Sequence, residues 1–479
     1  MLTTKCLIFR NDVNYGLICQ KINISPMKST KIIFAALLFT LVLSSCSSDS
    51  DPESGKEVVI PPPVVPPVTQ PIVDAKITAF SKNYGAPGDE VTLTGENFTD
   101  KIENIQITFD LTPAKIVSAS ATEIKFILPA TTYLVPVLNL SITNTKITNN
   151  VKNLYNGNIA VLNPVVSGAW TVLASPSDNN GSVSSIQILD NRAMYYHSEK
   201  VITFDGATGS YFYVYRSLDE GKTWKLWTET ATSYGLTFLA TTNDKGWSMY
   251  GAGDIYNLSV GGEERTKLFK SSSSYITSMV SNDDLNNGTL VTLNGQVFKT
   301  TDGANFTNEY SMSGNNYGVG YPTASLDTDH IWIGGSKGTT LSDGFAMLPF
   351  LLYKKSAADG WKELFFSNTE RNTVFSDMQF VDANFGFALF QGTNFSTVLK
   401  TSNGGDSWTE VDKTHKFKTF TFKDELNGFA TEGNIIYKTT DGGISWSVDY
   451  THNEDILRIK YKNNVIWGVS KSKILRRYL

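Results

Sequence analysis

The sequence contains few of the residues that bind metals, form disulfides or act as nucleophiles. Its 479 residues include three cysteines and four histidines. Cys6 and Cys19 precede the expected start of the mature protein, so the remainder cannot hold a disulfide framework. The histidines are dispersed over residues 197–452, without a His-Glu-x-x-His pattern, and no Gly-x-Ser-x-Gly motif stands in a strand–turn–helix context. We therefore expect no metal and no cofactor.

Positive charge is also scarce. The chain has 41 Lys and Arg against 46 Asp and Glu, for a net charge of −5. Residues 1–45 hold five basic residues and one acidic residue, so the chain from Cys46 onward has a net charge of −9. Because a protein that binds phosphate backbones needs the opposite balance, nucleic acid is not an expected partner.

No apolar run is long enough to span a bilayer. The stretch Ile32–Leu43 has about half the length that a membrane-spanning helix requires. It follows the basic segment Met27–Lys31 and precedes Leu43-Ser-Ser-Cys46, which is the order of elements in a secretory signal peptide. This segment resembles the lipobox of bacterial lipoproteins. The resemblance implies cleavage before Cys46 and attachment of lipid to that residue.

Residues 27–45 are accordingly assigned to a lipoprotein signal peptide. Residues 1–26 have no role in this scheme, so we predict that translation begins at Met27 and that they are a non-native extension. A genuine extended leader is the alternative.

Residues 46–73 read as a disordered, proline-rich linker behind the lipidated cysteine. Pro61–Pro67 favours an extended polyproline conformation, which sets the rest of the chain at a distance from the membrane. The acidic stretch Ser47–Glu53 resembles surface-export signals of lipoproteins in some Gram-negative bacteria. The resemblance implies an outer-membrane lipid anchor that faces the cell exterior, with a periplasm-facing anchor as the alternative.

From residue 74 the pattern changes to alternating strands separated by turns. Val91-Thr-Leu93 alternates in the manner of a half-buried strand, and Glu123–Pro129 ends a later strand in proline. Together with Gly88-Asp89 these segments resemble an IPT/TIG domain, an immunoglobulin-like sandwich, over residues 74–163. The resemblance implies a spacer or a binding surface and no catalysis.

Four segments further along the chain repeat one motif: a hydroxyl residue, Asp or Asn two places on, glycine, and a closing aromatic residue. The Asp or Asn is expected to accept backbone N–H bonds within a tight turn, and the aromatic to fill the wedge between neighbouring sheets. The segments are Ser217–Trp224, Thr300–Phe306, Thr401–Trp408 and Thr439–Trp446, with Ser356–Trp361 as a degenerate fifth. The turn residues are Asp219, Asp302, Asn403 and Asp441, and the aromatics are Trp224, Phe306, Trp408 and Trp446.

This motif resembles the Asp-box (BNR) repeat of sialidase-like and photosystem-assembly-factor-like β-propellers. The resemblance implies that residues 164–479 form a propeller of four-stranded blades in which the Asp-boxes are structural. Three strands within Ile456–Tyr478 are expected to pair with Trp170–Leu173 and close the ring without leaving a sheet edge. The fold prediction is an all-β chain with an immunoglobulin-like sandwich and a seven-bladed propeller, with six or eight blades as alternatives. The propeller is expected to be monomeric.

The function is predicted to lie in the loops at the end of the propeller away from the Asp-boxes. Aligning the innermost strands places several aromatic and charged residues there, where tyrosines can stack on sugar rings and charged groups can bond hydroxyls. These candidate ligand-binding residues are Tyr234, Tyr275, Tyr317, Tyr321, Arg371, Lys416 and Asp455. The order of domains resembles that of glycan-binding lipoproteins of polysaccharide-uptake systems, which implies a non-catalytic glycan-binding module with no catalytic residues.

Two alternatives remain open. A glycoside hydrolase needs two carboxylates flanking the sugar, and Asp377, Asp424 and Asp455 lie near innermost strands or their turns. A sialidase is disfavoured because the sequence lacks the Arg-Ile-Pro motif of that family. A protein-binding scaffold of a surface complex accounts for the sequence nearly as well as a glycan binder.

Overall fold

The computed structural model describes two parts of the chain separately. The described residues are 3–11, 14–22, 73–164, 167–176, 182–204, 207–232, 237–242, 244–250, 253–258, 265–270, 275–312, 317–341, 344–367, 370 and 372–479. In the first part, β1 (Thr3–Asn11) and β2 (Asn14–Ile22) pair as an antiparallel hairpin. The predicted signal peptide, Cys46 and the proline-rich linker lie outside the described residues. No helix in the described ranges is long and apolar enough to cross a membrane.

The second part begins with a β-sandwich. One sheet has the order β11-β3-β5-β9-β8, a second has the order β10-β6-β7, and the short strands β12 and β4 pair with each other. The strands are β3 (Val73–Phe80), β4 (Tyr84–Gly85), β5 (Glu90–Glu96), β6 (Ile105–Phe109), β7 (Thr112–Pro113), β8 (Lys115–Ala119), β9 (Glu123–Ile127), β10 (Leu138–Ile142), β11 (Thr145–Asn149) and β12 (Ala160–Val161), with a 3-10 turn η1 at Ile102–Asn104.

Along these strands buried apolar residues alternate with exposed ones, and the buried residues form the core of the sandwich. Val91 and Leu93 of β5 are fully buried, whereas Glu90 and Glu96 on the same strand are exposed. Their partners from the facing sheet include Phe109, whose ring lies 5.8 Å from that of Phe126. The predicted immunoglobulin-like sandwich is confirmed.

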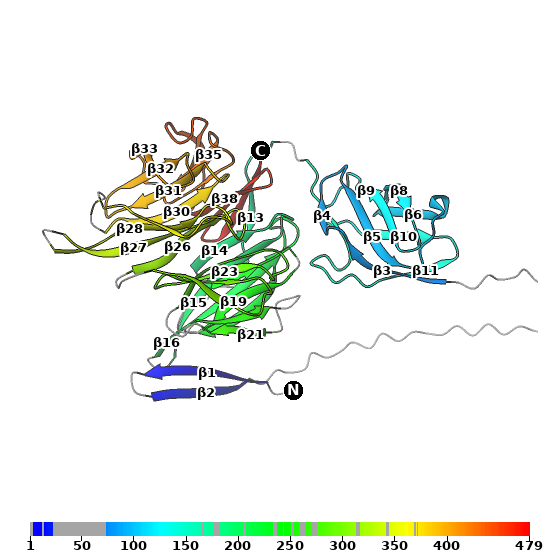
Figure 1. Ribbon diagram of the computed structural model, residues 1–479, viewed down its shortest axis with the longest axis horizontal. Coiled ribbons are helices and arrows are strands. Elements are labelled where there is room, and N and C mark those ends of the chain that lie inside the picture. Colours follow the sequence, from blue (N-terminus) through cyan, green and yellow to red (C-terminus); the bar gives the residue numbers. More distant parts are fainter. Residues whose placement is uncertain are drawn as a thin grey trace, which may run out of the picture. The chain divides into compact units, whose positions relative to one another are not determined.

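The rest of the described chain forms seven four-stranded antiparallel sheets, which Figure 1 shows in chain order from green β14 to red β40. Their strands are β14 (Ser182–Ile188), β15 (Met194–Phe204), β16 (Ala207–Ser217) and β17 (Lys225–Thr232); β18 (Thr237–Ala240), β19 (Gly246–Tyr250), β20 (Asp254–Leu258) and β21 (Arg265–Lys270); β22 (Ile276–Ser281), β23 (Gly288–Thr292), β24 (Gln296–Thr300) and β25 (Thr307–Ser311); β26 (Tyr317–Ser325), β27 (Ile331–Leu341), β28 (Gly344–Lys354) and β29 (Lys362–Phe365); β30 (Val374–Phe380), β31 (Gly386–Gln391), β32 (Ser396–Thr401) and β33 (Thr409–Asp412); β34 (Thr419–Phe422), β35 (Gly428–Glu432), β36 (Ile435–Thr439) and β37 (Ser447–Thr451); β38 (Ile456–Lys462), β39 (Val465–Ser470) and β40 (Lys473–Tyr478), joined by β13 (Thr171–Ala174).

The first strand of each sheet contacts the first strand of the next. Side chains bridge several of these pairs: Gln187 Nε2 donates to Ala240 O at 2.9 Å, and Gln379 Nε2 donates to Phe422 O at 2.7 Å. The ends of the domain meet because β13 pairs antiparallel with β40, with Thr171 opposite Arg476. The prediction that Trp170–Leu173 supplies the fourth strand of the last sheet is confirmed, and so is the all-β propeller.

Glycines in the second strands explain the recurring Gly-Phe-Ala sequence. A Cβ on Gly386 would come within 2.6 Å of the Phe380 ring, and one on Gly428 within 2.5 Å of the Phe422 ring. In these two sheets the aromatic residue at the end of the first strand therefore folds over a position that must lack a side chain. Phe422 then stacks on Phe387 of the preceding sheet at 3.4 Å between centroids.

Candidate functional site

The Asp-box residues hold their own turns. In the first box, Ser217 Oγ donates to Asp219 Oδ1 at 2.9 Å and accepts from the backbone N–H of Gly221 at 2.8 Å. Asp219 also accepts from the backbone N–H of Thr223 at 2.8 Å. The corresponding bonds to Asp302, Asn403 and Asp441 measure 2.8, 3.0 and 2.9 Å.

These bonds occupy the carboxylate groups of the Asp-box acids. Hydrogen bonds from the Ser445 hydroxyl and backbone N–H lower the pKa of Asp441 to about 2. The pKa of Asp302 lies well below its usual range because the backbone and side-chain N–H groups of Asn305 donate to it. A carboxyl group that is ionised and saturated in this way is a poor general acid.

Asparagine already replaces the acid in one box, which gives a graded test of this role. Asp441→Ala removes the carboxylate that accepts from the backbone N–H groups of Ile444 and Ser445, and we expect it to lower the free energy of unfolding by about 2 kcal/mol. Asp441→Asn keeps the acceptor oxygen and reproduces the Asn403 turn, where the amide donates to Ser407 Oγ at 2.9 Å, so it should cost less than about 1 kcal/mol. Urea unfolding of both variants checks the order, and an equal loss in the two would contradict it.

The sandwich occupies the end of the propeller that carries the Asp-boxes. In a four-stranded up-and-down sheet, the turn between strands one and two lies at the same end as the turn between strands three and four. Two first turns contact the sandwich: Tyr155 Oη donates to Asn191 O at 3.0 Å, and Asn83 Nδ2 donates to Thr242 O at 3.2 Å. We call this the Asp-box end and the other the opposite end.

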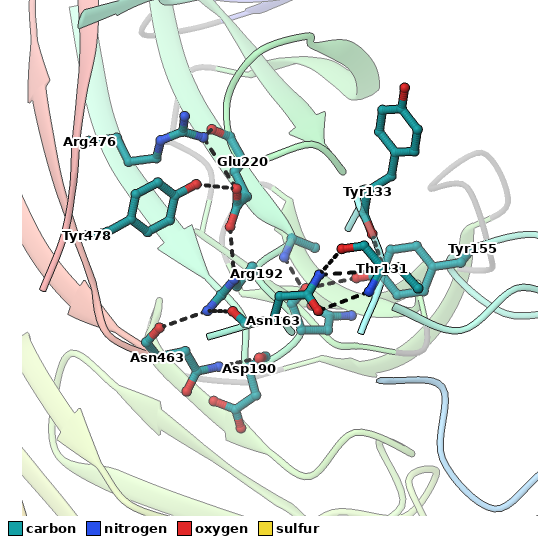
Figure 2. Close-up of polar contacts among 12 residues, drawn as sticks. Thr131, Tyr133, Tyr155, Asn163, Asp190, Arg192, Glu220, Asn463, Arg476 and Tyr478 are labelled. Carbon is teal, nitrogen blue, oxygen red and sulfur yellow. Dashed lines mark hydrogen bonds and ion pairs between the residues drawn. The ribbon is translucent and has the colours of Figure 1, made fainter. Parts of the chain in front are cut away.

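A cluster of buried charges lies at the junction of the sandwich and the propeller (Figure 2). Glu220 accepts from Arg192 Nη1 at 3.2 Å, from Arg476 Nη1 at 3.4 Å and from Tyr478 Oη at 2.5 Å. Burial, then the bond to Glu220, raises the pKa of Tyr478 to about 12, so the phenol stays protonated. Arg192 Nη2 also donates to Asn463 O at 3.3 Å.

Glu220 stands where the other boxes have glycine. Its φ is +60°, and the equivalent Gly303, Gly404 and Gly442 have φ of +71°, +71° and +77°. A left-handed conformation costs a side chain roughly 1–2 kcal/mol. In the first box this cost is offset because the Glu220 carboxylate links the turn to β40, the last strand of the ring.

A cavity of about 470 Å³ lies beside this cluster, lined by residues of both domains: Thr131–Val135, Val161, Asn163, Arg192, Leu218, Asp219, Glu220, Lys222 and Tyr478. Both carboxylate oxygens of Glu220 are engaged, and Asp219 is engaged in its turn. The two arginines that meet here hold a carboxylate of the protein itself. We therefore assign a structural role to these charged residues.

Three of the seven predicted ligand-binding residues can be placed with their side chains. Tyr275, Lys416 and Asp455 precede β22, β34 and β38 and are exposed at the opposite end, Tyr275 by 38%. Tyr317 and Tyr321 lie on β26, and only their backbone is described. Tyr234 and Arg371 lie outside the described residues. The structure thus brings three of them to one end of the ring.

Two acids considered for glycosidase chemistry have other partners. Asp377 is buried and accepts from Thr419 Oγ1 at 2.6 Å, which links two neighbouring sheets. Asp424 accepts from the backbone N–H groups of Leu426 and Asn427 at 2.9 and 2.8 Å, and these bonds hold its pKa below the usual value against the opposing effect of partial burial. Neither is placed as a free general acid.

The structure adds an aromatic cavity that the sequence did not reveal. It has a volume of about 410 Å³ and is lined by residues of the sheets β26–β29 and β30–β33: Phe366, Glu370, Thr373, Phe390, Phe395, Thr397, Leu399, Trp408, Glu410 and Lys413. We call it the Phe395 cavity. Phe395 lies in the turn between β31 and β32, and Glu370 and Thr373 precede β30, so these lining residues lie at the opposite end.

The walls of the Phe395 cavity differ in chemistry. The rings of Phe366 and Phe390 meet edge to face at 5.0 Å and form an apolar wall. Lys413 Nζ lies 3.0 Å from Glu410 Oε1, and both side chains are largely exposed. No group of three or more His, Cys, Asp or Glu side chains within the described ranges is placed to hold a metal.

Comparisons with known proteins found one matching family model and a number of similar solved structures. Residues 75–160 match the family model of the IPT/TIG domain. YCF48 from Cyanidioschyzon merolae is 16% identical, with a TM-score of 0.45 over 65% of this chain and 99% of its own. An auxiliary nutrient binding protein from Bacteroides thetaiotaomicron is 13% identical, with a TM-score of 0.37 over 85% of this chain and 98% of its own.

The GH74 enzyme of Niastella koreensis is 12% identical, with a TM-score of 0.36 over 60% of this chain and 62% of its own. No curated protein matches the chain. The sheets, the turns and the family match together define the chain as an all-β protein in which an IPT/TIG domain is followed by an Asp-box β-propeller.

Proposed function

We propose that this protein is a non-catalytic binding module, carried on a lipid anchor at Cys46 and displayed on the outer membrane, with glycans as its ligands. The anchor rests on the signal-peptide pattern before Cys46 and on the extended segment that follows it. Labelling of cells with a palmitate analogue tests it. The wild type should be labelled and a Cys46→Ala variant should not.

One observation carries the binding role: the two ends of the propeller are used differently. Turn bonds and the docked sandwich occupy the Asp-box end. The opposite end presents Tyr275, Lys416, Asp455 and the Phe395 cavity. An apolar concavity with a few polar groups is the usual form of a ligand site.

The chemistry of the opposite end favours sugars. A pyranose ring has an apolar face that packs on an aromatic side chain, and hydroxyl groups at its rim that bond carboxylates, hydroxyls and amines. The Phe395 cavity offers partly exposed Phe395 and Trp408 for the first kind of contact, and the exposed side chains of Glu370, Glu410 and Lys413 for the second.

A panel of polysaccharides and oligosaccharides, with retention and release of reducing sugar both measured, tests the proposal. The chain without its signal peptide and with Cys46→Ser should retain at least one glycan and release no sugar from it. Sugar release would establish the glycoside hydrolase alternative. Absence of both retention and release would turn the search to protein partners in a surface complex.

A further inference from the structure

We propose that the Phe395 cavity is the main sugar subsite and that it takes a neutral pyranose unit in preference to a uronic acid. The inference rests on the proposed function and names the ligand class of that same site. It predicts where on the ring a glycan binds and which glycans bind weakly.

The size of the cavity suits a small ligand. Ligand sites in proteins commonly have volumes of roughly 300–1,000 Å³. At about 410 Å³ the Phe395 cavity lies in the lower part of that range. A short stretch of a sugar chain fits it better than a folded protein partner, which would need a broad, flat surface.

Hydrogen bonding and ring packing fix the orientation of the aromatic side chains that line the cavity. Trp408 is half-buried, and its Nε1 donates to Gly405 O at 3.1 Å, which fixes the indole against the Asp-box turn. Phe390 is buried and packs edge to face against Phe375 at 4.6 Å. A platform whose rings are already ordered loses little conformational entropy when a ligand stacks on it.

Gly392 positions the ring of Phe395. A Cβ on Gly392 would approach Phe395 Cε1 to 2.1 Å, so the ring lies directly over a residue without a side chain. The backbone N–H of Gly392 donates to Phe395 O at 3.1 Å and closes the turn. Gly392→Ala should displace the ring without deleting it.

The charges of the cavity select against acidic sugars. Two carboxylates, Glu370 and Glu410, line it with one ammonium group, Lys413, and that group is paired with Glu410 at 3.0 Å. A further anion inserted here would face a net negative charge, counted over the lining residues that the structure describes. The hydroxyl groups of a neutral sugar can instead donate to the carboxylates.

The test measures dissociation constants of the chain carrying Cys46→Ser. The probes are oligosaccharides of neutral β-glucan, mannan and xylan, together with polygalacturonate and alginate. We expect a neutral probe to bind best, and Phe395→Ala to weaken it about tenfold. Gly392→Ala should weaken it in the same direction. Phe345→Ala, at a 59% exposed phenylalanine that does not line the cavity, should leave the dissociation constant unchanged.

Each other outcome has a distinct meaning. If a neutral glycan binds and Phe395→Ala leaves its affinity unchanged while Tyr275→Ala lowers it, the subsite assignment is overturned and the binding function stands. Polygalacturonate or alginate binding as tightly as the best neutral probe would overturn the assigned ligand class. Failure of every probe with the unsubstituted cavity would overturn the glycan-binding function itself. Circular dichroism of each variant establishes that the fold is intact.

Discussion

Replacing Glu220 by glutamine should lower the free energy of unfolding by about 3 kcal/mol, since breaking a buried ion pair leaves its partner charges uncompensated. Two guanidinium groups depend on this carboxylate, those of Arg192 and Arg476, at 3.2 and 3.4 Å. Their Nε atoms are buried and have no hydrogen-bond partner among the described residues. Glutamine keeps the size of the side chain and the left-handed backbone, so the substitution isolates the charge.

The effect should be localised as well as large. Glu220 lies in the turn after β16, and Arg476 and Tyr478 lie on β40 (Figure 2). The cluster therefore joins the sheet β14–β17 to the sheet formed by β38–β40 and β13. Amide hydrogen exchange should therefore accelerate in β13 and β40 before it does in β30–β33.

A matched control lies close by. Asp190 forms an ion pair with Lys462, and their side chains are 52% and 41% exposed. Exposed pairs contribute about 0–1 kcal/mol, so Asp190→Asn should change the denaturant midpoint little. If Glu220→Gln were no more destabilising than Asp190→Asn, the cluster would not be what holds the ring closed.

The sequence predicted those parts of the fold that depend on short-range patterns. The Asp-boxes could be recognised because a turn uses residues within eight positions of one another, and the Asp219 and Asp441 bonds follow from that spacing. The closing pair β13 and β40 could be predicted because a ring must leave no free sheet edge.

The candidate sites were harder to predict, because they combine residues from distant segments. Arg192 and Glu220 are 28 residues apart and Arg476 lies 256 residues beyond Glu220, and no local pattern connects the three. The Phe395 cavity arises where a turn of one sheet meets the end of the preceding one, so its aromatic residues look like ordinary core residues in the sequence. A local signal did exist at Gly392-Thr-Asn-Phe395, where an aromatic residue closes an otherwise polar turn.

Below neutral pH, His197 should make the propeller less stable. This histidine is 4% exposed and lies between the rings of Phe212 and Phe238, at 5.7 and 5.5 Å. Burial lowers its pKa from 6.5 to about 4, because the imidazolium would lose its hydration there. Its Nε2 has no hydrogen-bond partner in the described part of the chain that would compensate.

The direction of the effect follows from which state binds the proton. Between pH 6.5 and about 4 the unfolded chain is protonated at His197 and the folded chain is not, so lowering the pH favours unfolding. From pH 7.5 to pH 4.5 this residue should remove about 2.5 kcal/mol of stability. His197→Leu and His197→Gln both lack a titrating group there, so guanidinium unfolding at the two pH values should show a loss smaller by that amount in either variant. Carboxyl groups titrate in all three proteins and cancel in the comparison. A loss equal to that of the wild type in both variants would mean that His197 is protonated without unfolding, and that its site admits water.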